Sequence, residues 1–307
     1  MANILKSIRN NRTVVFGATG RVGSALVCEL EKRGVETAAV VRSKSRAAQL
    51  FPGTEVIVAD LHDPDSVINA CRDAHTLFLV TPEDFSSATV WQDGARIIRH
   101  YVRAIRSHGI RRVVALSSGG AQSGHAGYFM SPEATKPDSI GNLEISNWLE
   151  HAISDLPVEQ YIIRPAYYYS NWMGNMDVIR GFGKLPTFFP AGLSVSMIAP
   201  EDVALFAADL VCGERGPGTC EISGPREYTS VQVARVFGEY LGRQVEVQEV
   251  PLEQLVGILT GAGMSKDAAL NMERMTAAVI DGRTGAQFPE QVIRLGTTLE
   301  EYLRGQG

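Results

Sequence analysis

The sequence TVVFGATGRVGSALVCELEKRG, residues 13–34, contains a short apolar run, a glycine-rich turn and an amphipathic segment in succession. The first run is β-prone, and the apolar spacing after it predicts a helix that ends at Gly34. Gly17 suits a tight turn, Gly20 lets the backbone approach a pyrophosphate, and Gly23 lets the helix pack closely on the strand. Because a helix N-terminus points free N–H groups at phosphates, we predict a dinucleotide-binding strand–turn–helix unit.

A basic cluster stands where the second predicted strand, residues 37–42, ends: Arg42, Ser43 and Lys44. An acidic residue at this position binds the ribose hydroxyls of NAD. A guanidinium instead donates forked hydrogen bonds to phosphate oxygens, and the hydroxyl and ammonium groups add to them. We therefore predict that the cluster binds the 2′-phosphate of NADP. The alternative is a solvated basic turn with no ligand.

The rest of the N-terminal half alternates strand and helix. Strands are predicted over residues 55–61, 76–82 and 112–118, and helices over residues 63–74 and 87–109. Strands that read as continuous apolar runs between helices indicate a parallel sheet covered on both faces. The predicted fold class is thus a doubly wound α/β Rossmann sheet, whose ligand crevice lies at the carboxyl ends of its strands.

Candidate cofactor contacts follow from this crevice. Asp60 and Leu61 end the third strand, where the chain reaches the adenine. For Asp60, an acidic loop residue without a ligand is an equally good interpretation. The complete set is Gly17, Thr19, Gly20, Arg21, Val22, Gly23, Arg42, Ser43, Lys44, Asp60, Leu61, Thr81, Pro82, Ser117, Pro165 and Tyr167. The expected cofactor is NADP(H).

Several segments resemble, in matching order, the NmrA-like group of atypical short-chain dehydrogenases/reductases. They are GATGRVG, VVRSKSR, ADLHDPDSV, LFLVTP, VVALSSGGA, EQYIIRPAYYYSNW and SMIAPEDVALFAADLV. The resemblance continues through residues 220–251, so nearly the whole chain is covered. It implies a Rossmann domain, a smaller C-terminal substrate domain and a preference for NADP. Members of this group include quinone and dye reductases, isoflavone-type reductases, and regulators that bind the nucleotide without turning it over.

The expected organisation has an NADP-binding Rossmann domain at residues 1–170, with return segments near 195–225. A smaller α/β substrate-binding domain follows at residues 171–307. Within it, residues 172–198 interleave Trp, Met and Phe with glycines. That pattern is equally consistent with an apolar pocket and with a core.

The wider dehydrogenase family carries Tyr-x-x-x-Lys on the helix after the fifth strand, and this chain departs from that pattern. The helix predicted over residues 139–154 contains neither Tyr nor Lys, so the usual proton donor is missing. The replacement candidates are Ser118, Tyr167 and Asn142. Each has a structural alternative: a turn serine, a core tyrosine and a solvent-facing helix cap.

The function predicted from these features is an NADPH-dependent reductase. It would transfer a hydride to a small, fairly apolar substrate: a quinone, an imine or iminium ion, an enone or an activated carbonyl. The alternative is a non-catalytic NADP-sensing regulatory protein. A nucleotide-sugar epimerase is disfavoured, since oxidation of a sugar hydroxyl needs the base that the missing pair supplies.

Composition sets the outer bounds of function. The chain has 307 residues, of which 45% are hydrophobic and 21% charged, and its net charge of -5 does not suggest nucleic acid as a partner. It has no apolar run of membrane-spanning length and no secretory signal pattern. Four scattered cysteines with no CxxC pair favour a reduced cytoplasmic protein without a metal site. A small-molecule substrate is the expected partner, and homo-oligomerisation stays open.

Overall fold

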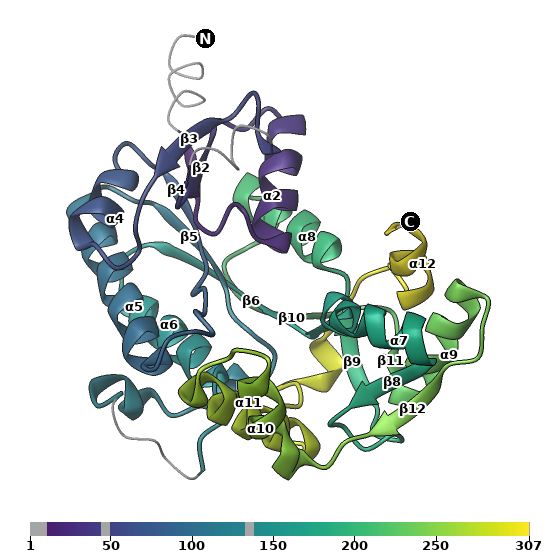
Figure 1. Cartoon of the computed structure of the whole chain (residues 1–307). Helices are drawn as coiled ribbons and strands as arrows, with labels where there is room; N and C mark the ends of the chain where they lie inside the picture. The colour runs from purple at the N-terminus through teal and green to yellow at the C-terminus, as the bar shows by residue number, and fades with distance from the viewer. Residues whose placement is uncertain (1–10, 44–49, 133–137, 307) are drawn as a thin grey trace.

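An eight-stranded sheet forms the centre of the computed structural model, which describes residues 11–43, 50–132 and 138–306 (Figure 1). The strand order is β13-β10-β6-β5-β4-β1-β2-β3, and every neighbouring pair is parallel. The strands are β1 Thr13–Val15, β2 Thr37–Val41, β3 Glu55–Val58, β4 Thr76–Leu79, β5 Arg112–Leu116, β6 Glu159–Pro165, β10 Gly218–Ser223 and β13 Ile293–Arg294. The predicted doubly wound parallel sheet is confirmed.

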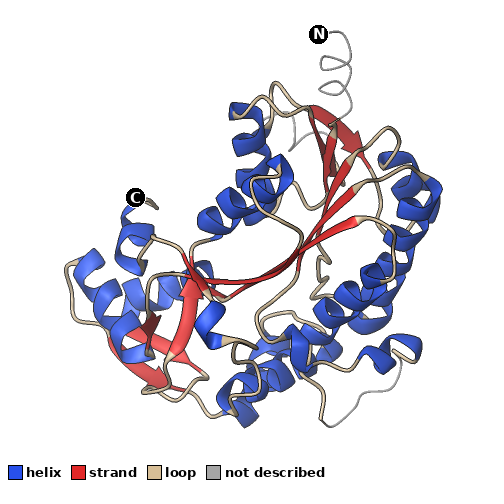
Figure 2. Ribbon diagram, turned by 180° about the vertical axis from the view of Figure 1, so that it is seen from behind, coloured by secondary structure: helices blue, strands red, loops and turns tan. Residues whose placement is uncertain are grey.

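Helices cover both faces of this sheet, as Figure 2 shows from behind. One face carries α2 Arg21–Lys32 and α8 Pro200–Cys212, and the other carries α4 Pro64–Ala70, α5 Val90–Ser107 and α6 Leu143–Ser154. Successive strand residues point to opposite faces. Val14 and Leu77 therefore pack beneath α4–α6, whereas Val15 and Phe78 pack beneath α2 and α8. Both faces are buried, so side chains pointing to either face are apolar and the strand sequences are unbroken apolar runs.

A second, smaller lobe contains a three-stranded sheet, β11-β9-β7, and a two-stranded sheet, β12-β8. Its strands are β7 Tyr167–Tyr168, β8 Lys184–Thr187, β9 Val195–Ile198, β11 Glu227–Tyr228 and β12 Glu246–Glu249. Its helices are α7 Met176–Phe182, α9 Ser230–Leu241 and α12 Leu299–Arg304. Trp172, Phe189 and Met197 all lie in the core of this lobe. For these three side chains, the core reading of the Met- and Phe-rich segment is the right one.

The C-terminal half also returns to the large sheet. β10 pairs with β6, and β13 pairs with β10 at the sheet edge. The α8 helix packs against α2 on the face that covers β1. The return to the sheet by β13 was not among the predicted segments. A division of the chain near residue 170 remains a proposal.

The helices α10 Leu255–Gly261 and α11 Lys266–Ile280 lie beside the carboxyl ends of the central strands (Figure 1). Asp267 on α11 accepts a hydrogen bond from the Val90 N–H at 2.9 Å. Gly141, just before α6, has φ +62°, and a Cβ there would lie 2.0 Å from the carbonyl oxygen of Asn271. The second half of the chain thus touches the start of α5 and the turn before α6. Short 3₁₀ turns complete the chain: η1 Ala121–Ser123, η2 Ala126–Met130, η3 Tyr169–Asn175, η4 Leu252–Gln254 and η5 Pro289–Gln291.

Candidate functional site

The glycine turn between β1 and α2 has the geometry that its spacing predicts. Gly17 has φ +68°, and a Cβ there would lie 2.4 Å from the Cγ2 atom of Val80. A Cβ on Gly23 would lie 2.2 Å from the carbonyl oxygen of Gly17, so only glycine lets the helix approach this closely. A Cβ on Gly20 would meet only that same oxygen, at 3.2 Å. The outer side of Gly20 is therefore open to a ligand.

The N-terminus of α2 offers free donors beside this turn. Helical hydrogen bonding begins with the Ser24 N–H, which donates to the Gly20 carbonyl at 2.8 Å. The N–H groups of Arg21, Val22 and Gly23 lie ahead of that bond and are left out of the helical ladder. Together with the helix dipole they suit a pyrophosphate. Arg21 is exposed here, whereas Val22 is buried under the helix. Thr19, also among the predicted contacts, is partly buried in the turn itself.

The basic cluster follows β2 at the same edge of the sheet. Arg42 and Ser43 are both exposed, and Lys44 lies outside the described residues. The pKa of the Asp84 carboxyl is lowered by hydrogen bonds from Ser86 and, to a smaller extent, by the charge of Arg42. Arg42 therefore lies within electrostatic range of Asp84 in the loop after β4.

The predicted adenine contacts after β3 have partners of their own. The Asp60 carboxylate accepts the backbone N–H of His62 at 2.9 Å, and this bond fixes the turn. The Leu61 side chain packs on the core beneath α5, and its carbonyl oxygen lies 2.8 Å from the His100 Nδ1 atom. Asp60 remains exposed at its position, so a role in ligand binding and a role in the turn are compatible.

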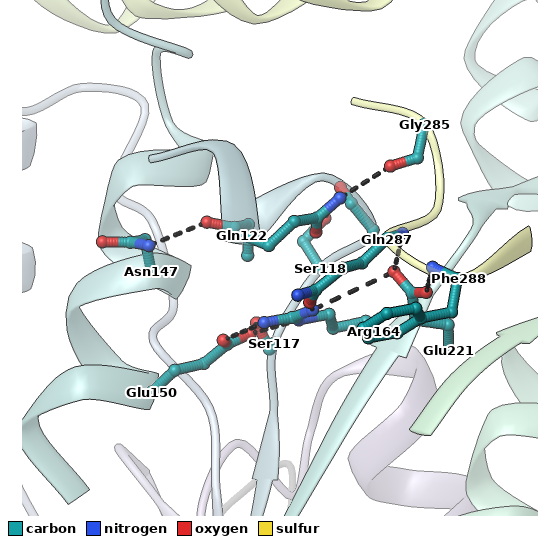
Figure 3. Close-up of polar contacts among 12 residues, drawn as sticks. Ser117, Ser118, Gln122, Asn147, Glu150, Arg164, Glu221, Gly285, Gln287 and Phe288 are labelled. Carbon is teal, nitrogen blue, oxygen red and sulfur yellow. Dashed lines mark hydrogen bonds and ion pairs between the residues drawn. The ribbon is translucent and has the colours of Figure 1, made fainter. Parts of the chain in front are cut away.

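A buried ion pair lies beneath the ends of β5 and β6 (Figure 3). Arg164 donates from Nε and Nη2 to the Glu150 carboxylate at 2.9 and 2.6 Å. Its Nη1 donates to Gln287 Oε1 at 2.9 Å and lies 4.0 Å from Glu221. Burial lowers the pKa of Arg164, but the hydrogen bonds and charge of Glu150 outweigh it, so the net shift is upward. The Ser117 hydroxyl donates to Glu150 as well, so this predicted cofactor contact turns its side chain to the buried pair.

The same cluster anchors a C-terminal segment. The backbone N–H groups of Gln287 and Phe288 donate to Glu221 at 3.0 and 3.2 Å. Gln122 Nε2 donates to the Gly285 carbonyl at 2.6 Å, as Figure 3 shows. Residues 285–288 are thereby held against the ends of β6 and β10. An arginine within the apolar stretch YIIRPAY indicates a buried ion pair. This pair was not predicted from the sequence.

Two of the three replacement candidates lie at the strand ends as expected. Ser118 is partly buried, and its hydroxyl makes only a long 3.4 Å contact with the neighbouring Gly119 carbonyl. Tyr167 packs edge-to-face on Trp172 and Phe189, with ring centroids 6.1 and 5.7 Å away. Burial raises the pKa of Tyr167 to about 12, so its phenol stays protonated and can only donate or accept a hydrogen bond near neutral pH. Two other predicted contacts, Thr81 and Pro82, follow β4, and a third, Pro165, ends β6.

The third candidate, Asn142, is not the solvent-facing cap that was considered. Its exposed fraction is 3%, and its side chain makes no capping bond at the start of α6. Its Nδ2 atom donates to Glu83 Oε2 at 2.7 Å and lies 3.4 Å from the sulfur of Met272. Its Oδ1 atom is buried and has no hydrogen-bond partner among the described residues. The Gly141 turn and α11 bury this side chain, which local sequence cannot indicate.

Glu83 is the functional candidate that sequence reasoning missed. It follows Thr81 and Pro82 directly and is partly buried. Burial raises the pKa of its carboxyl to about 7, although the bond from Asn142 favours the charged form. The available signal was a carboxylate placed just past the carboxyl end of an apolar strand.

Two kinds of feature are missing from residues 11–43, 50–132 and 138–306. No three His, Cys, Asp or Glu side chains gather there as a metal site would require. No helix in these ranges has the length and apolar character needed to cross a bilayer.

Comparison with known proteins supports the nucleotide site that the geometry indicates. A family described as NAD(P)H-binding matches residues 17–212. The NAD(P)H azoreductase of Xenophilus azovorans is 24% identical over 273 residues, which are 86% of each chain. Two solved structures share the fold. A nucleoside-diphosphate-sugar epimerase of Staphylococcus aureus has a TM-score of 0.75 at 16% identity and covers 95% of this chain and 99% of its own. The triphenylmethane reductase of Citrobacter sp., complexed with NADP(H), has a TM-score of 0.71 at 20% identity and covers 96% and 99%.

The family match spans the glycine turn, the ends of β2 to β6 and the α8 helix. The nucleotide cofactor predicted from the glycine turn and the resemblance stated from the motifs are both confirmed. The chain belongs to this NAD(P)H-binding family and has a Rossmann fold.

Proposed function

We propose that this protein is an NADPH-dependent reductase that transfers a hydride to a small, electron-poor substrate. The observation that carries the proposal is a complete glycine turn at the carboxyl edge of a parallel sheet, together with an α6 helix that has neither Tyr nor Lys. Hydride acceptors that need little acid assistance suit such a site: quinones, imines and iminium ions, enones and activated carbonyls. The names of an azoreductase and a triphenylmethane reductase among the similar proteins agree with acceptors of this kind.

The role proposed for each residue follows from its place in the fold. The turn at residues 17–23 and the α2 N-terminus hold the pyrophosphate, and Arg42 binds the 2′-phosphate. The cofactor, when bound, supplies the hydride. Ser118 and Tyr167 orient the substrate from the ends of β5 and β6. We assign the substrate-facing wall to the smaller lobe together with α10 and α11.

NADPH consumption against a panel of acceptors tests this function. The panel contains a p-quinone, an azo dye, a cyclic iminium salt and a simple unactivated ketone. We expect turnover with the first three and little with the ketone. Ser118→Ala and Tyr167→Phe should each reduce turnover by ~10- to 100-fold, the weak end of general acid catalysis. The proposal is contradicted if the protein prefers the simple ketone and loses all activity with either substitution, because that hydroxyl would then be indispensable.

A non-catalytic NADP sensor is the second candidate, and the same missing Tyr and Lys favour it. Its signature is tight NADPH binding without consumption of the cofactor by any acceptor in the panel. Fluorescence titration of NADPH in parallel with the turnover assay separates the two functions.

A further inference from the structure

The contact between Glu83 and Asn142 lies in the part of the crevice where a nicotinamide ring would bind. In a doubly wound sheet, the half built on β1–β3 holds the adenosine, and the half built on β4–β6 holds the nicotinamide. Glu83 follows β4, and Asn142 begins the α6 helix that follows β5. The contact therefore spans two elements of the nicotinamide half. The inference drawn from it rests on the proposed reductase function.

The backbone at Gly141, directly before Asn142, is packed closely against its neighbours. The indole Nε1 of Trp91 donates to the Gly141 carbonyl at 3.2 Å. On the other side, α11 packs so closely that a Cβ on Gly141 would lie 2.0 Å from the Asn271 carbonyl oxygen. Asn142 Nδ2 then reaches Glu83 at 2.7 Å. The close packing places the Asn142 amide where it donates one hydrogen bond to the carboxyl of Glu83.

The polar group formed by these two residues is incomplete. The Oδ1 atom of Asn142 is buried without a partner in the described part of the chain. Buried polar atoms are nearly always paired, so an orphan beside the partly buried Glu83 indicates a place for a ligand. Among the described residues no charged group contributes to the pKa of the Glu83 carboxyl, and a pKa of about 7 keeps it partly protonated near neutral pH.

Other carboxylates of this region are already engaged. Glu150 is paired with Arg164. Glu144 accepts the His125 and Ile140 backbone N–H groups at 2.7 and 3.2 Å. Glu83 differs from these two, because among the described residues it accepts one hydrogen bond, from the neutral amide of Asn142.

Three charged side chains on the elements around Glu83 form hydrogen bonds with other residues. Asp84 is exposed and accepts from Ser86. On α11, Asp267 accepts from the Val90 N–H, and Arg274 donates to Asn271 at 3.3 Å. Burial is accordingly the cause of the raised pKa of Glu83.

We propose that Glu83, oriented by Asn142, donates a proton to the substrate as the hydride arrives. The hydride adds to the electron-poor end of a double bond, and the electron pair of that bond moves to the other end. With a quinone or another carbonyl that end is oxygen, and it takes the proton from the carboxylic acid of Glu83. The resulting carboxylate regains a proton from water. An N-methyl iminium ion needs only the hydride, because its nitrogen already carries the positive charge that the electron pair neutralises.

This difference in proton demand provides the experiment. Turnover at saturating NADPH is measured with a p-quinone and with an N-methyl cyclic iminium salt, for the native protein, Glu83→Gln and Asp84→Asn. We expect Glu83→Gln to slow the quinone reaction by ~10- to 100-fold and to leave the iminium reaction within about twofold of native, as for a variant that removes only proton donation. Asp84→Asn removes a neighbouring exposed carboxylate and should change neither reaction. NADPH affinity and the melting temperature of each variant confirm that it is folded.

The pH dependence of the quinone rate gives a second test, because a purely structural role of Glu83 would not affect it. Since only the protonated acid donates, the native quinone rate should fall as the pH rises through the pKa of Glu83, and Glu83→Gln should remove this dependence. Asn142→Ala removes a donor that favours the carboxylate, so it should shift the midpoint to higher pH. Glu83→Asp keeps an acid and should keep a pH dependence at a reduced rate.

The outcomes separate this inference from the function on which it rests. If Glu83→Gln slows both substrates equally, or neither, proton donation by Glu83 is wrong although the protein is a reductase. If the native protein binds NADPH but reduces neither substrate, the reductase function fails and the role of Glu83 fails with it.

Discussion

At the scale of single residues, three glutamates of the crevice region differ only in what surrounds them. Glu150 faces the guanidinium of Arg164, and Glu144 accepts backbone N–H groups near His125. Among the described residues, the Asn142 amide is the one donor to Glu83, and burial raises the pKa of the Glu83 carboxyl to about 7. The chemical use of each carboxylate therefore depends on its partners, and a pKa of about 7 lets Glu83 release and regain a proton near neutral pH.

The first residue-level prediction concerns the stability of the cofactor-free protein. The unfolded chain releases the Glu83 proton near pH 4.5, whereas the folded protein keeps it up to about pH 7. Between these values the folded state binds more protons, so stability is full below the lower value and falls as the pH rises toward 7. The loss amounts to at most roughly 3 kcal/mol. Urea denaturation from about pH 4 to 8 should show this slope in the native protein, and it should flatten in Glu83→Gln. Parallel slopes in both proteins would contradict the raised pKa.

The second residue-level prediction concerns Arg42. Hydrogen bonds to charged groups contribute roughly 1.5–3 kcal/mol each, so Arg42→Gln should weaken NADPH binding by ~10- to 100-fold while NADH binding stays near native. Lys32→Gln is a matched control, since it removes one positive charge from an exposed position at the other end of α2. Fluorescence titration of both cofactors measures the effect. Equal losses for NADPH and NADH would place the 2′-phosphate elsewhere.

At the scale of elements, two close contacts hold the site together. The first is the approach of α2 to the β1 turn, where Gly23 leaves no room for a Cβ atom. The second is the buried Arg164–Glu150 pair, which joins β6 to α6 beneath the strand ends. Each contact fixes the relative position of two elements that must both face the ligand.

Substitution of Gly23 by Ala tests the first contact. The new Cβ would lie 2.2 Å from the Gly17 carbonyl oxygen, so the helix must move. Overpacking of this kind costs about 1–3 kcal/mol of unfolding free energy, and the shifted helix should bind NADPH more weakly. Gly109→Ala is the control, because no atom lies within 4 Å of its Cβ position. A Gly23→Ala protein with native stability and affinity would rule out tight helix packing as the reason for this glycine.

Comparison of a buried and an exposed ion pair tests the second contact. Glu150→Gln leaves the buried Arg164 without its charged partner and should cost about 3 kcal/mol, the low end for such a loss, because Glu221 remains 4.0 Å away. Glu159→Gln breaks the Arg112–Glu159 pair, whose glutamate side chain is 52% exposed, and should cost under about 1 kcal/mol. Urea denaturation of both variants gives the two values. Similar costs would mean that burial does not strengthen the Arg164 contact.

At the scale of the whole molecule, the large sheet is built from both halves of the chain. β10 pairs with β6 over five residue positions from Gly218 to Ile222, and α8 packs against α2. The α11 helix also buries Asn142, and residues 285–288 reach Arg164 and Glu221. The nucleotide half and the substrate half are therefore joined by more than one strand.

A fragment of residues 1–170 tests this joining. It lacks β10, β13 and α8, so β6 would become an exposed edge and the face of α2 would lose its cover. We expect the fragment to show no cooperative thermal transition and no NADPH binding, whereas the full chain shows both. Circular dichroism melts and fluorescence titration measure this. A cooperative, NADPH-binding fragment would show that the first 170 residues fold independently.

The sequence by itself determined the parallel sheet, the glycine turn and the nucleotide cofactor. These are local properties, because strand burial, helix periodicity and the need for glycine are written within a few consecutive residues. Gly17 and Gly23 lie where their spacing predicts, each with a close contact that excludes a side chain.

Only the tertiary structure decided which polar side chains meet. Glu83 and Asn142 are 59 positions apart, and Arg164 and Gln287 are 123 apart. Ser117 turns its hydroxyl to Glu150, and Asn142 is buried rather than exposed, because elements distant in the chain pack over both. Burial and pairing depend on all the neighbours that folding brings together, and the raised pKa of Glu83 exists only in that packed environment.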